Sequence, residues 1–218
     1  MTSRRPGKNL FDLPAEEPLG PGAVLLRGFA APHEKKLLAA IEEISAAAPF
    51  RQMLTPGGFR MAVAMTNCGE AGWITDRRGY RYDRLDPESK APWPAMPELF
   101  RREATRAAAA AGYPEFAPDV CLINRYEPGA KLSLHQDRDE QAFDAPIVSF
   151  SLGVAAKFLF GGLARKDPVR RLWLESGDVV VWGGPSRLAY HGIDPLAEGN
   201  HSLTGRYRFN LTFRRALS

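Results

Sequence analysis

Cysteine is scarce in this sequence. Among 218 residues it occurs twice, as Cys68 and Cys121, which lie in unrelated sequence contexts. Two isolated thiols exclude a disulfide framework and a zinc site built from thiolates. Such cysteine usage is typical of a protein in a reducing compartment, and we expect a cytoplasmic location.

Long hydrophobic runs are also missing. The stretch APIVSFSLGVAAKFLF is interrupted by serine, glycine and lysine, and it never reaches the uninterrupted length that a membrane span needs. The N-terminal residues MTSRRPGKNLFDLPAEEP have no apolar segment behind their basic residues, so no signal peptide is predicted. We therefore expect no membrane partner.

What is present is the composition of a folded protein. Hydrophobic residues make up 44% of the chain and charged residues 25%, and the length suits one domain with a sizeable core. We expect a flexible segment rich in Pro, Gly and charge over residues 1–20, then a single monomeric domain over 21–218. The net charge of +4 and the pI of about 9.2 favour a polyanionic partner.

Two helices and a long series of short strands are predicted. PHEKKLLAAIEEISAAA, from about residue 32, and PELFRREATRAAAAAG, over 97–112, carry apolar residues at helical spacing behind an initial proline. After residue 112, about eight short apolar runs are separated by Pro or Gly turns. This series is typical of a jelly roll or sandwich. The predicted class is mainly β (α+β), with two helices covering one face of a β-body over about 113–216.

Residues 50–92, between the two helices, are too irregular for core helix. MAVAM predicts a short strand with Met61, Val63 and Met65 on one face. Nearby, arginines interleave with aromatic residues, a mixture that contacts phosphates and stacks on bases, although a solvated loop is the alternative. These residues are Arg77, Arg78, Arg81, Arg84, Trp73, Tyr80 and Tyr82.

The four histidines are few enough to consider one by one. In LSLHQDRDE, an extended backbone would place His135 and Asp137 on the same face. Imidazole and carboxylate together suit iron, and two histidines with one carboxylate leave three coordination positions open. His33 precedes a helix and His201 lies in a polar turn. His191, which closes RLAY in the same β-body, is therefore the best candidate for a third ligand, with a hydrogen-bonded surface histidine as the alternative.

The last predicted strand, RYRFNLTFRR, alternates strictly between apolar and polar residues. We expect its apolar face to pack under the helices and its polar face to point into the roll, rather than to solvent. Arg208 and Arg214 would lie roughly 20 Å apart along this strand and could grip a short dicarboxylate between them. Asn210 of the same strand, with Asn124 and Tyr126 of CLINRY, could supply further hydrogen bonds.

Several strings resemble one family. TPGGF, AMTNCG, CLINRY, PGAKLSLHQD, GDVVVWGG and NLTFR are similar to segments of the bacterial AlkB nucleic-acid demethylases, which are iron(II) and 2-oxoglutarate-dependent dioxygenases. The similarity runs from about residue 20 to 215. It implies a double-stranded β-helix (jelly roll) with covering helices and an N-terminal nucleotide-recognition lid over about 50–92.

The resemblance also implies a role for each candidate residue. Iron(II) would be held by His135, Asp137 and His191. The co-substrate 2-oxoglutarate would be held by Asn124, Tyr126, Arg208, Asn210 and Arg214. The damaged base or its strand would be contacted by Trp73, Tyr80, Arg81, Tyr82, Asp139 and Arg165.

The implied reaction is oxidative demethylation of N-alkylated bases, such as 1-methyladenine and 3-methylcytosine. The substrate would be alkylated DNA, single- or double-stranded, with RNA as a further candidate. Formaldehyde would be released while 2-oxoglutarate and O₂ are consumed and succinate is formed. Phe59, Arg60 and Phe209 depart from the family's usual pattern, which bears on the preferred lesion and strand.

Three alternatives stand beside this reading. A dioxygenase of the same chemistry could act on a protein side chain or a small metabolite. A nucleic-acid-binding protein could use a degenerate oxygenase scaffold. A cupin-type metal protein would not use 2-oxoglutarate, and it would leave Arg208 and Arg214 without a shared role.

Overall fold

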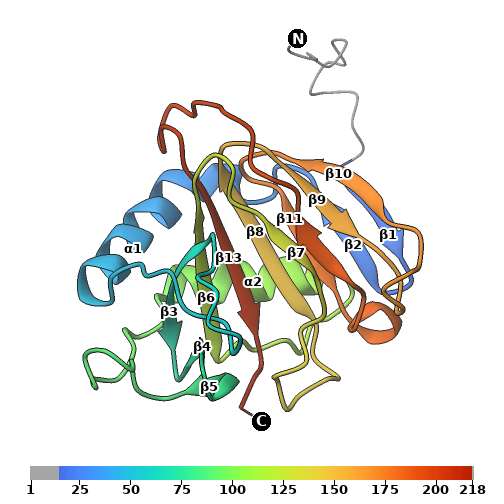
Figure 1. Cartoon of the computed structure of the whole chain (residues 1–218). Helices are drawn as coiled ribbons and strands as arrows, with labels where there is room; N and C mark the ends of the chain where they lie inside the picture. The colour runs from blue at the N-terminus through green and yellow to red at the C-terminus, as the bar shows by residue number, and fades with distance from the viewer. Residues whose placement is uncertain (1–14, 218) are drawn as a thin grey trace.

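The computed structural model of the chain describes residues 15–217. Two helices, a large sheet and a small sheet form three layers, with a separate hairpin beside them (Figure 1). The helical elements are η2 (Ala31–His33), α1 (Glu34–Ala47), α2 (Glu98–Ala110) and η3 (Gly184–Ser186). The strands are β1 (Glu16–Gly20), β2 (Ala23–Leu26), β3 (Ala64–Gly69), β4 (Gly72–Asp76), β5 (Gly79–Asp83), β6 (Val120–Tyr126), β7 (Leu132–His135), β8 (Ile147–Gly153), β9 (Ala156–Phe160), β10 (Arg170–Leu174), β11 (Val179–Trp182), β12 (His191–Ile193) and β13 (Arg208–Arg214).

The two main sheets are antiparallel and make a jelly roll. The large sheet has the order β1-β2-β11-β8-β13-β6-β3, and the small sheet has the order β10-β9-β12-β7. Strands β4 and β5 pair only with each other among the described residues. The eight strands predicted after residue 112 are all found, as β6 to β13, which confirms the predicted class.

Alternation of side chains along the large sheet builds two cores. In β11, Val179 and Val181 point to the helices, whereas Val180 and Trp182 point between the sheets. Both predicted helices contribute buried apolar residues to the first core. The large sheet is therefore buried on both faces, and its strands read as nearly continuous apolar runs.

The final strand divides the two layers as its pattern predicts. Leu211 and Phe213 of β13 pack in the core beneath the helices, and Phe213 meets Phe100 of α2 edge to face at 5.8 Å. The polar residues that alternate with the apolar ones along β13 are buried on the opposite face of the sheet. They are Arg208, Asn210, Thr212 and Arg214. This places the charged side chains of β13 inside the roll, away from bulk water.

The N-terminal prediction needs correction. Residues 1–14 lie outside the described residues, but Glu16–Gly20 forms strand β1, paired with β2, where a loose segment was predicted. Its Leu19 is buried between the sheets. The Pro- and Gly-rich composition hid this strand, because an edge strand tolerates residues that a central strand excludes.

Residues 50–92 are more ordered than their composition indicated. They contain the hairpin β4–β5 and a turn closed by pairing of Leu54 with Arg60. The strand expected through MAVAM begins only at Ala64, so Met61 and Val63 precede it.

The two cysteines are neighbours in the fold. Cys68 of β3 lies directly opposite Cys121 of β6, and both are free and fully buried. No sequence pattern predicts that these cysteines meet, because β3 and β6 are far apart in the sequence and become neighbours only when the sheet forms. Burial, with Cys68 a second cause, raises the pKa of Cys121 well above its ordinary value, as expected for inert core thiols.

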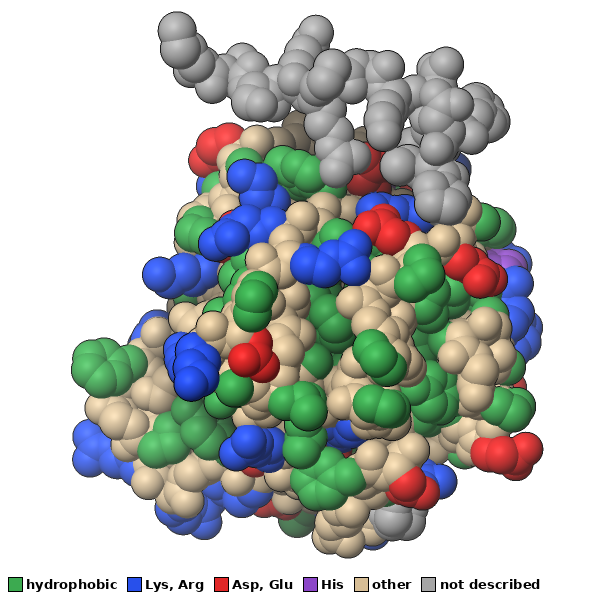
Figure 2. Space-filling view, turned by 90° about the vertical axis from the view of Figure 1, so that its right-hand side faces the viewer, with side chains coloured by type: hydrophobic (Ala, Val, Ile, Leu, Met, Phe, Trp, Pro, Cys, Tyr) green, Lys and Arg blue, Asp and Glu red, His purple; other side chains and the backbone are tan. Residues whose placement is uncertain are grey.

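The surface in Figure 2 belongs to the side of the molecule that carries β1 and β10. Cationic, anionic and apolar side chains are interspersed on it, as on an ordinary solvated surface. Within residues 15–217, neither helix combines the length and the apolar composition needed to cross a membrane.

Candidate active site

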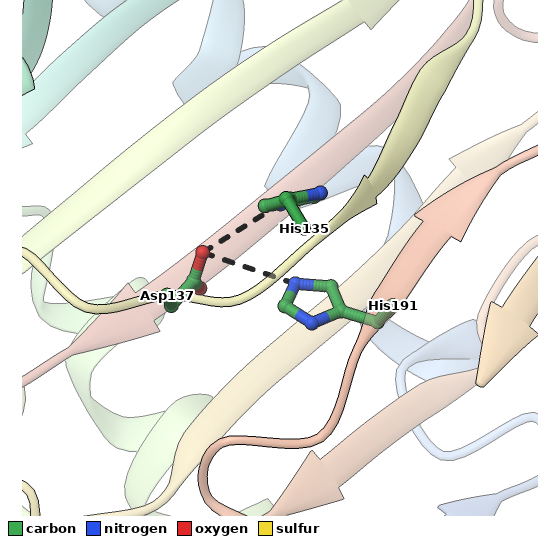
Figure 3. A group of neighbouring side chains, drawn as sticks. All are labelled: His135, Asp137 and His191. Carbon is green, nitrogen blue, oxygen red and sulfur yellow. Dashed lines mark ion pairs between the residues drawn. The ribbon is translucent and has the colours of Figure 1, made fainter. Parts of the chain in front are cut away.

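Three predicted ligands converge at the β7–β12 edge of the small sheet (Figure 3). His135 ends β7, Asp137 follows two residues later, and His191 opens β12. Because β12 pairs with β7, His191 lies directly opposite His135. The candidate ligand atoms of all three side chains lie within 4.8 Å of one another. Sheet pairing thus brings the second imidazole to the His-x-Asp pair, as predicted.

Backbone hydrogen bonds orient the two imidazoles. Nδ1 of His135 lies 2.8 Å from the carbonyl oxygen of Ser133, and Nδ1 of His191 lies 3.0 Å from that of Ala189. A carbonyl oxygen only accepts, so Nδ1 carries the proton and Nε2 is free to coordinate. Both Nε2 atoms face Oδ1 of Asp137, at 3.6 and 3.8 Å.

The Asp137 carboxylate is held by a buried arginine. Oδ2 of Asp137 accepts hydrogen bonds from Nε of Arg214 at 2.9 Å and from Nη2 at 2.5 Å. Burial by itself would raise the pKa of the Asp137 carboxyl. Arg214, followed by His191 and His135, outweighs burial and holds this pKa well below its usual range. The carboxylate is therefore ionised, with Oδ1 left toward the imidazoles.

The buried imidazole of His191 is neutral at physiological pH. Burial, and next to it the neighbouring His135, lowers the pKa of His191 from 6.5 to about 4. The ring of Trp182, whose centroid lies 4.9 Å away, covers one side of it. A neutral imidazole has the lone pair that a metal ligand needs.

A cavity of about 530 Å³ opens beside these three residues. It is lined by side chains from the hairpin, the loop after β7 and the inner face of the large sheet. Among the predicted site residues, those lining it are Trp73, Tyr80, Asn124, Tyr126, His135, Asp137, Asp139, His191, Arg208, Asn210 and Arg214.

Arg208 is a buried cation at the floor of this cavity. It is 1% exposed, and Nη2 donates a hydrogen bond to Oγ of Ser151 at 3.0 Å. Its Nε and Nη1 have no hydrogen-bond partner within residues 15–217. Burial lowers the pKa of Arg208, but a guanidinium stays charged in proteins. A buried charge with unused donors indicates a place for an anionic ligand.

Amides and hydroxyls surround this arginine. Nδ2 of Asn210 donates to Oγ of Ser149 at 2.7 Å, and Oδ1 of Asn210 accepts from Nδ2 of Asn124 at 3.2 Å. The guanidinium of Arg208 lies over the ring of Tyr126, at 5.1 Å from its centroid. Strand pairing explains this grouping, because β13 lies between β6 and β8 with Asn210 opposite Asn124.

The hairpin contributes a stacked aromatic pair at the other side of the cavity. The rings of Trp73 and Tyr80 lie 5.6 Å apart and nearly parallel, at 17°. Nε1 of Trp73 donates a hydrogen bond to Oδ2 of Asp139 at 2.7 Å. This bond connects the hairpin to the loop that carries Asp137.

Three predicted substrate contacts lie outside the cavity lining. Arg81 makes an ion pair with Asp76 at 2.8 Å. The hydroxyl of Tyr82 donates to Oε1 of Glu140 at 2.7 Å, and Nη1 of Arg165 donates to the carbonyl oxygen of Leu134 at 2.7 Å. The contacts of these three residues with the substrate stay predictions.

Sequence reasoning missed four polar residues that organise the site. Ser149 and Ser151 alternate in IVSFSLG, and this period of two could have revealed that both point inward. Glu140 and Arg187 are buried ions that contact the Asp137–Arg214 pair or its loop. No local pattern marks them, because their partners come from distant segments.

Comparison with known proteins identifies the family. Residues 22–214 match the family model of the 2OG-Fe(II) oxygenase superfamily. The chain is 61% identical over 203 residues to "Alpha-ketoglutarate-dependent dioxygenase AlkB" of Escherichia coli K12, covering 93% of this chain and 94% of that one. The chain belongs to the 2OG-Fe(II) oxygenase superfamily.

A second curated protein and a solved structure are also similar to this chain. "DNA N(6)-methyladenine demethylase ALKBH1D" of Arabidopsis thaliana is 40% identical over 127 residues, covering 53% of this chain and 29% of that one. The solved structure titled "The structure of OsALKBH1" superposes with a TM-score of 0.81 at 30% identity, covering 92% of this chain and 99% of that one. The jelly-roll fold is thereby confirmed.

The site fits the two groups that a 2OG-Fe(II) oxygenase uses. Two imidazoles and one ionised carboxylate form the donor set of iron(II) in oxygenases. The unused donors of Arg208 fit the carboxylate of a keto-acid. The chain is therefore an iron(II) and 2-oxoglutarate-dependent dioxygenase, and the degenerate and cupin-type alternatives are disfavoured.

Replacing the carboxylate ligand tests the metal site. We expect Asp137→Asn to weaken binding of Mn(II), used as an oxygen-stable substitute for iron(II), by about 100-fold or more, because the charge that faces both imidazoles is lost. Isothermal titration would measure this. Asp144→Asn is the control, since Asp144 is an exposed acid paired with Arg215. Equal Mn(II) affinity in wild-type protein and Asp137→Asn would contradict the assignment.

Proposed function

We propose that this dioxygenase demethylates N-alkylated bases in alkylated DNA, with 1-methyladenine and 3-methylcytosine as typical substrates and RNA as a second substrate class. One observation carries the proposal. A stacked Trp73–Tyr80 pair, with the Asp139 carboxylate bonded to Trp73, borders the cavity that contains the metal ligands. Aromatic rings and a carboxylate suit a flat cationic group.

The substrate class has a physical rationale. Methylation at N1 of adenine or N3 of cytosine makes the base cationic and blocks its pairing, so the base leaves the stack more easily than an intact one. The cavity of about 530 Å³ is large enough to hold a base beside a small keto-acid. The relatives' names support the type of reaction, since the Escherichia coli protein is named an alpha-ketoglutarate-dependent dioxygenase and the Arabidopsis protein a DNA N(6)-methyladenine demethylase.

Residues of the chain would position both reactants. When bound, iron(II) with 2-oxoglutarate and O₂ supplies the oxidation of the N-methyl carbon, which then leaves as formaldehyde while succinate is formed. Arg208 would hold a 2-oxoglutarate carboxylate through its free N–H groups, supported by the hydrogen-bonding residues Asn124, Tyr126 and Asn210. Arg214 would face the other end of the same molecule.

Cations around the opening would contact the nucleic-acid backbone. Lys131, just before β7, and Arg138, in the loop after β7, line the cavity. The exposed Arg165 is close to them, because its guanidinium donates a hydrogen bond to the carbonyl oxygen of Leu134 in β7. Arg81 would act from the hairpin. Such contacts provide affinity for phosphates without reading sequence.

The function is tested with enzyme loaded anaerobically with iron(II) and offered oligonucleotides that carry 1-methyladenine or 3-methylcytosine. We expect formaldehyde and restored base only when 2-oxoglutarate is present. A free amino acid and an unmodified oligonucleotide serve as controls. Succinate formation that responds to a small metabolite or peptide, and not to the methylated oligonucleotides, would favour the alternative hydroxylase reading.

The role of Arg208 has a distinct signature. We expect Arg208→Met to reduce the affinity for 2-oxoglutarate by roughly 30-fold or more, because the buried cation that would pair with a carboxylate of 2-oxoglutarate is lost. The same change should leave the thermal midpoint of the ligand-free protein unchanged or higher, because an unpaired buried charge is removed. Titration calorimetry and thermal unfolding measure the two effects. Arg171→Met is the exposed control, and unchanged 2-oxoglutarate affinity in Arg208→Met would reject the role.

Charge at Asp139 should determine lesion preference. Asp139→Asn keeps an oxygen that can accept from Trp73 Nε1 but removes the negative charge. We expect kcat/KM to fall about tenfold for cationic 1-methyladenine and 3-methylcytosine, and clearly less for neutral 3-methylthymine. Asp139→Ala should show the same order with a larger loss. Equal losses for cationic and neutral lesions in both variants would refute the role.

A further inference from the structure

Four charged side chains form one buried network behind the metal ligands. Asp137, Glu140, Arg187 and Arg214 are each at most 9% exposed. Buried ions destabilise a protein unless they are paired and hydrogen-bonded. The positions of these groups are therefore mutually dependent, and Tyr82 joins them from the hairpin.

Glu140 lies at the centre of the network. Its Oε1 accepts a hydrogen bond from the hydroxyl of Tyr82 at 2.7 Å and lies 3.2 Å from Nε of Arg214. Its Oε2 accepts from Nη2 of Arg187 at 3.1 Å. Three segments that are distant in sequence, namely β5, β13 and the turn after η3, thus meet on one carboxylate.

Arg214 is shared between two carboxylates. Its Nε lies 2.9 Å from Oδ2 of Asp137 and 3.2 Å from Oε1 of Glu140. Nη1 of Arg214 is buried without a hydrogen-bond partner within residues 15–217, and Arg214 lines the cavity. The contacts with Asp137 and Glu140 orient the plane of the Arg214 guanidinium, and this orientation determines the direction of Nη1.

Arg187 connects the loops of two metal ligands. It lies four residues before His191, and its Nη1 donates to the carbonyl oxygen of Asp137 at 3.1 Å. Its Nε donates to the carbonyl oxygen of Ala145 at 3.0 Å. A planar guanidinium can make all these bonds at once, including the one to Glu140, whereas a lysine ammonium cannot reproduce the fork.

We propose that Glu140, held by Arg187 and Tyr82, is a positioning residue for 2-oxoglutarate. It fixes Arg214 so that Oδ1 of Asp137 faces the imidazoles and Nη1 of Arg214 faces the co-substrate. This inference rests on the site assignment made under the proposed function. In this proposal Tyr82 orients Glu140 through its hydroxyl group and does not contact the base.

The hairpin takes part through this tyrosine. Tyr82 lies two residues after Tyr80 on β5 and opposite Trp73 on β4. Its hydroxyl reaches the buried Glu140, while Tyr80 and Trp73 line the cavity. The hairpin that would hold the base is thus bonded to the carboxylate that orients Arg214.

The test measures 2-oxoglutarate binding without nucleic acid. Protein loaded anaerobically with iron(II) is titrated with 2-oxoglutarate, and the visible charge-transfer absorption of the chelate gives both the Kd and the position of the band. The variants are Glu140→Gln, Arg187→Lys and Tyr82→Phe. Matched controls are Glu127→Gln, which removes a charge from an exposed acid, and Tyr113→Phe, which removes a hydroxyl that bonds Gly22 elsewhere.

We expect the Kd for 2-oxoglutarate to rise about 10-fold or more in Glu140→Gln and Arg187→Lys, and by a smaller factor in Tyr82→Phe. The absorption band should shift in all three, because the orientation of the ligands changes, and it should keep its position in both controls. Tyr82→Phe loses a single oxygen, so it decides the question if the other two variants fail to fold. A lower thermal midpoint with wild-type Kd and band in the folded variants would overturn the proposal, because the network would then be only structural.

The readouts separate this inference from the function on which it rests. A charge-transfer band in wild-type protein that is altered in the variants supports the positioning role, whatever substrate is oxidised. Failure to demethylate oligonucleotides with that band intact would reject only the nucleic-acid substrate. Absence of the band in wild-type protein would reject the site assignment and the positioning role together.

Discussion

The buried pair of Asp137 and Arg214 is the interaction on which the site depends. The guanidinium of Arg214 binds one carboxylate oxygen of Asp137 and leaves the other toward the imidazoles of His135 and His191. It also keeps the acid ionised in a buried place, where an isolated carboxyl would bind a proton. A single ion pair therefore supplies the charge, the orientation and the protonation state that a divalent metal requires.

Strand β13 makes this pair possible. Its apolar residues anchor it beneath α1 and α2, and that anchorage forces the alternate residues, including Arg208 and Arg214, into the roll. Burial of both arginines is tolerated because Arg214 pairs with acidic side chains, whereas Arg208 faces a cavity with room for an anion. The helices thus contribute to function without contacting the site, since their packing sets the direction of the strand that contains the cations.

Two side-chain hydrogen bonds join the hairpin β4–β5 to the loop after β7. Trp73 bonds Asp139 at the cavity, and Tyr82 bonds Glu140 behind it. Asp139 and Glu140 are consecutive residues just beyond the metal ligand Asp137. The loop after β7 is therefore held on one side by a metal-binding carboxylate and on the other by the segment proposed to receive the base.

The sequence by itself determined the class of the fold, the eight strands of the roll and the identity of the metal ligands, because alternation and turn residues are local signals and histidines are few. It also revealed the inward face of β13. Tertiary structure alone decided that Cys68 meets Cys121, that Glu16–Gly20 is a strand and that Tyr82 points to Glu140 rather than into the cavity. These features depend on partners far away in the chain, and buried charges such as Glu140 and Arg187 leave no periodic pattern, since what stabilises them is the opposite charge that folding brings within about 3 Å.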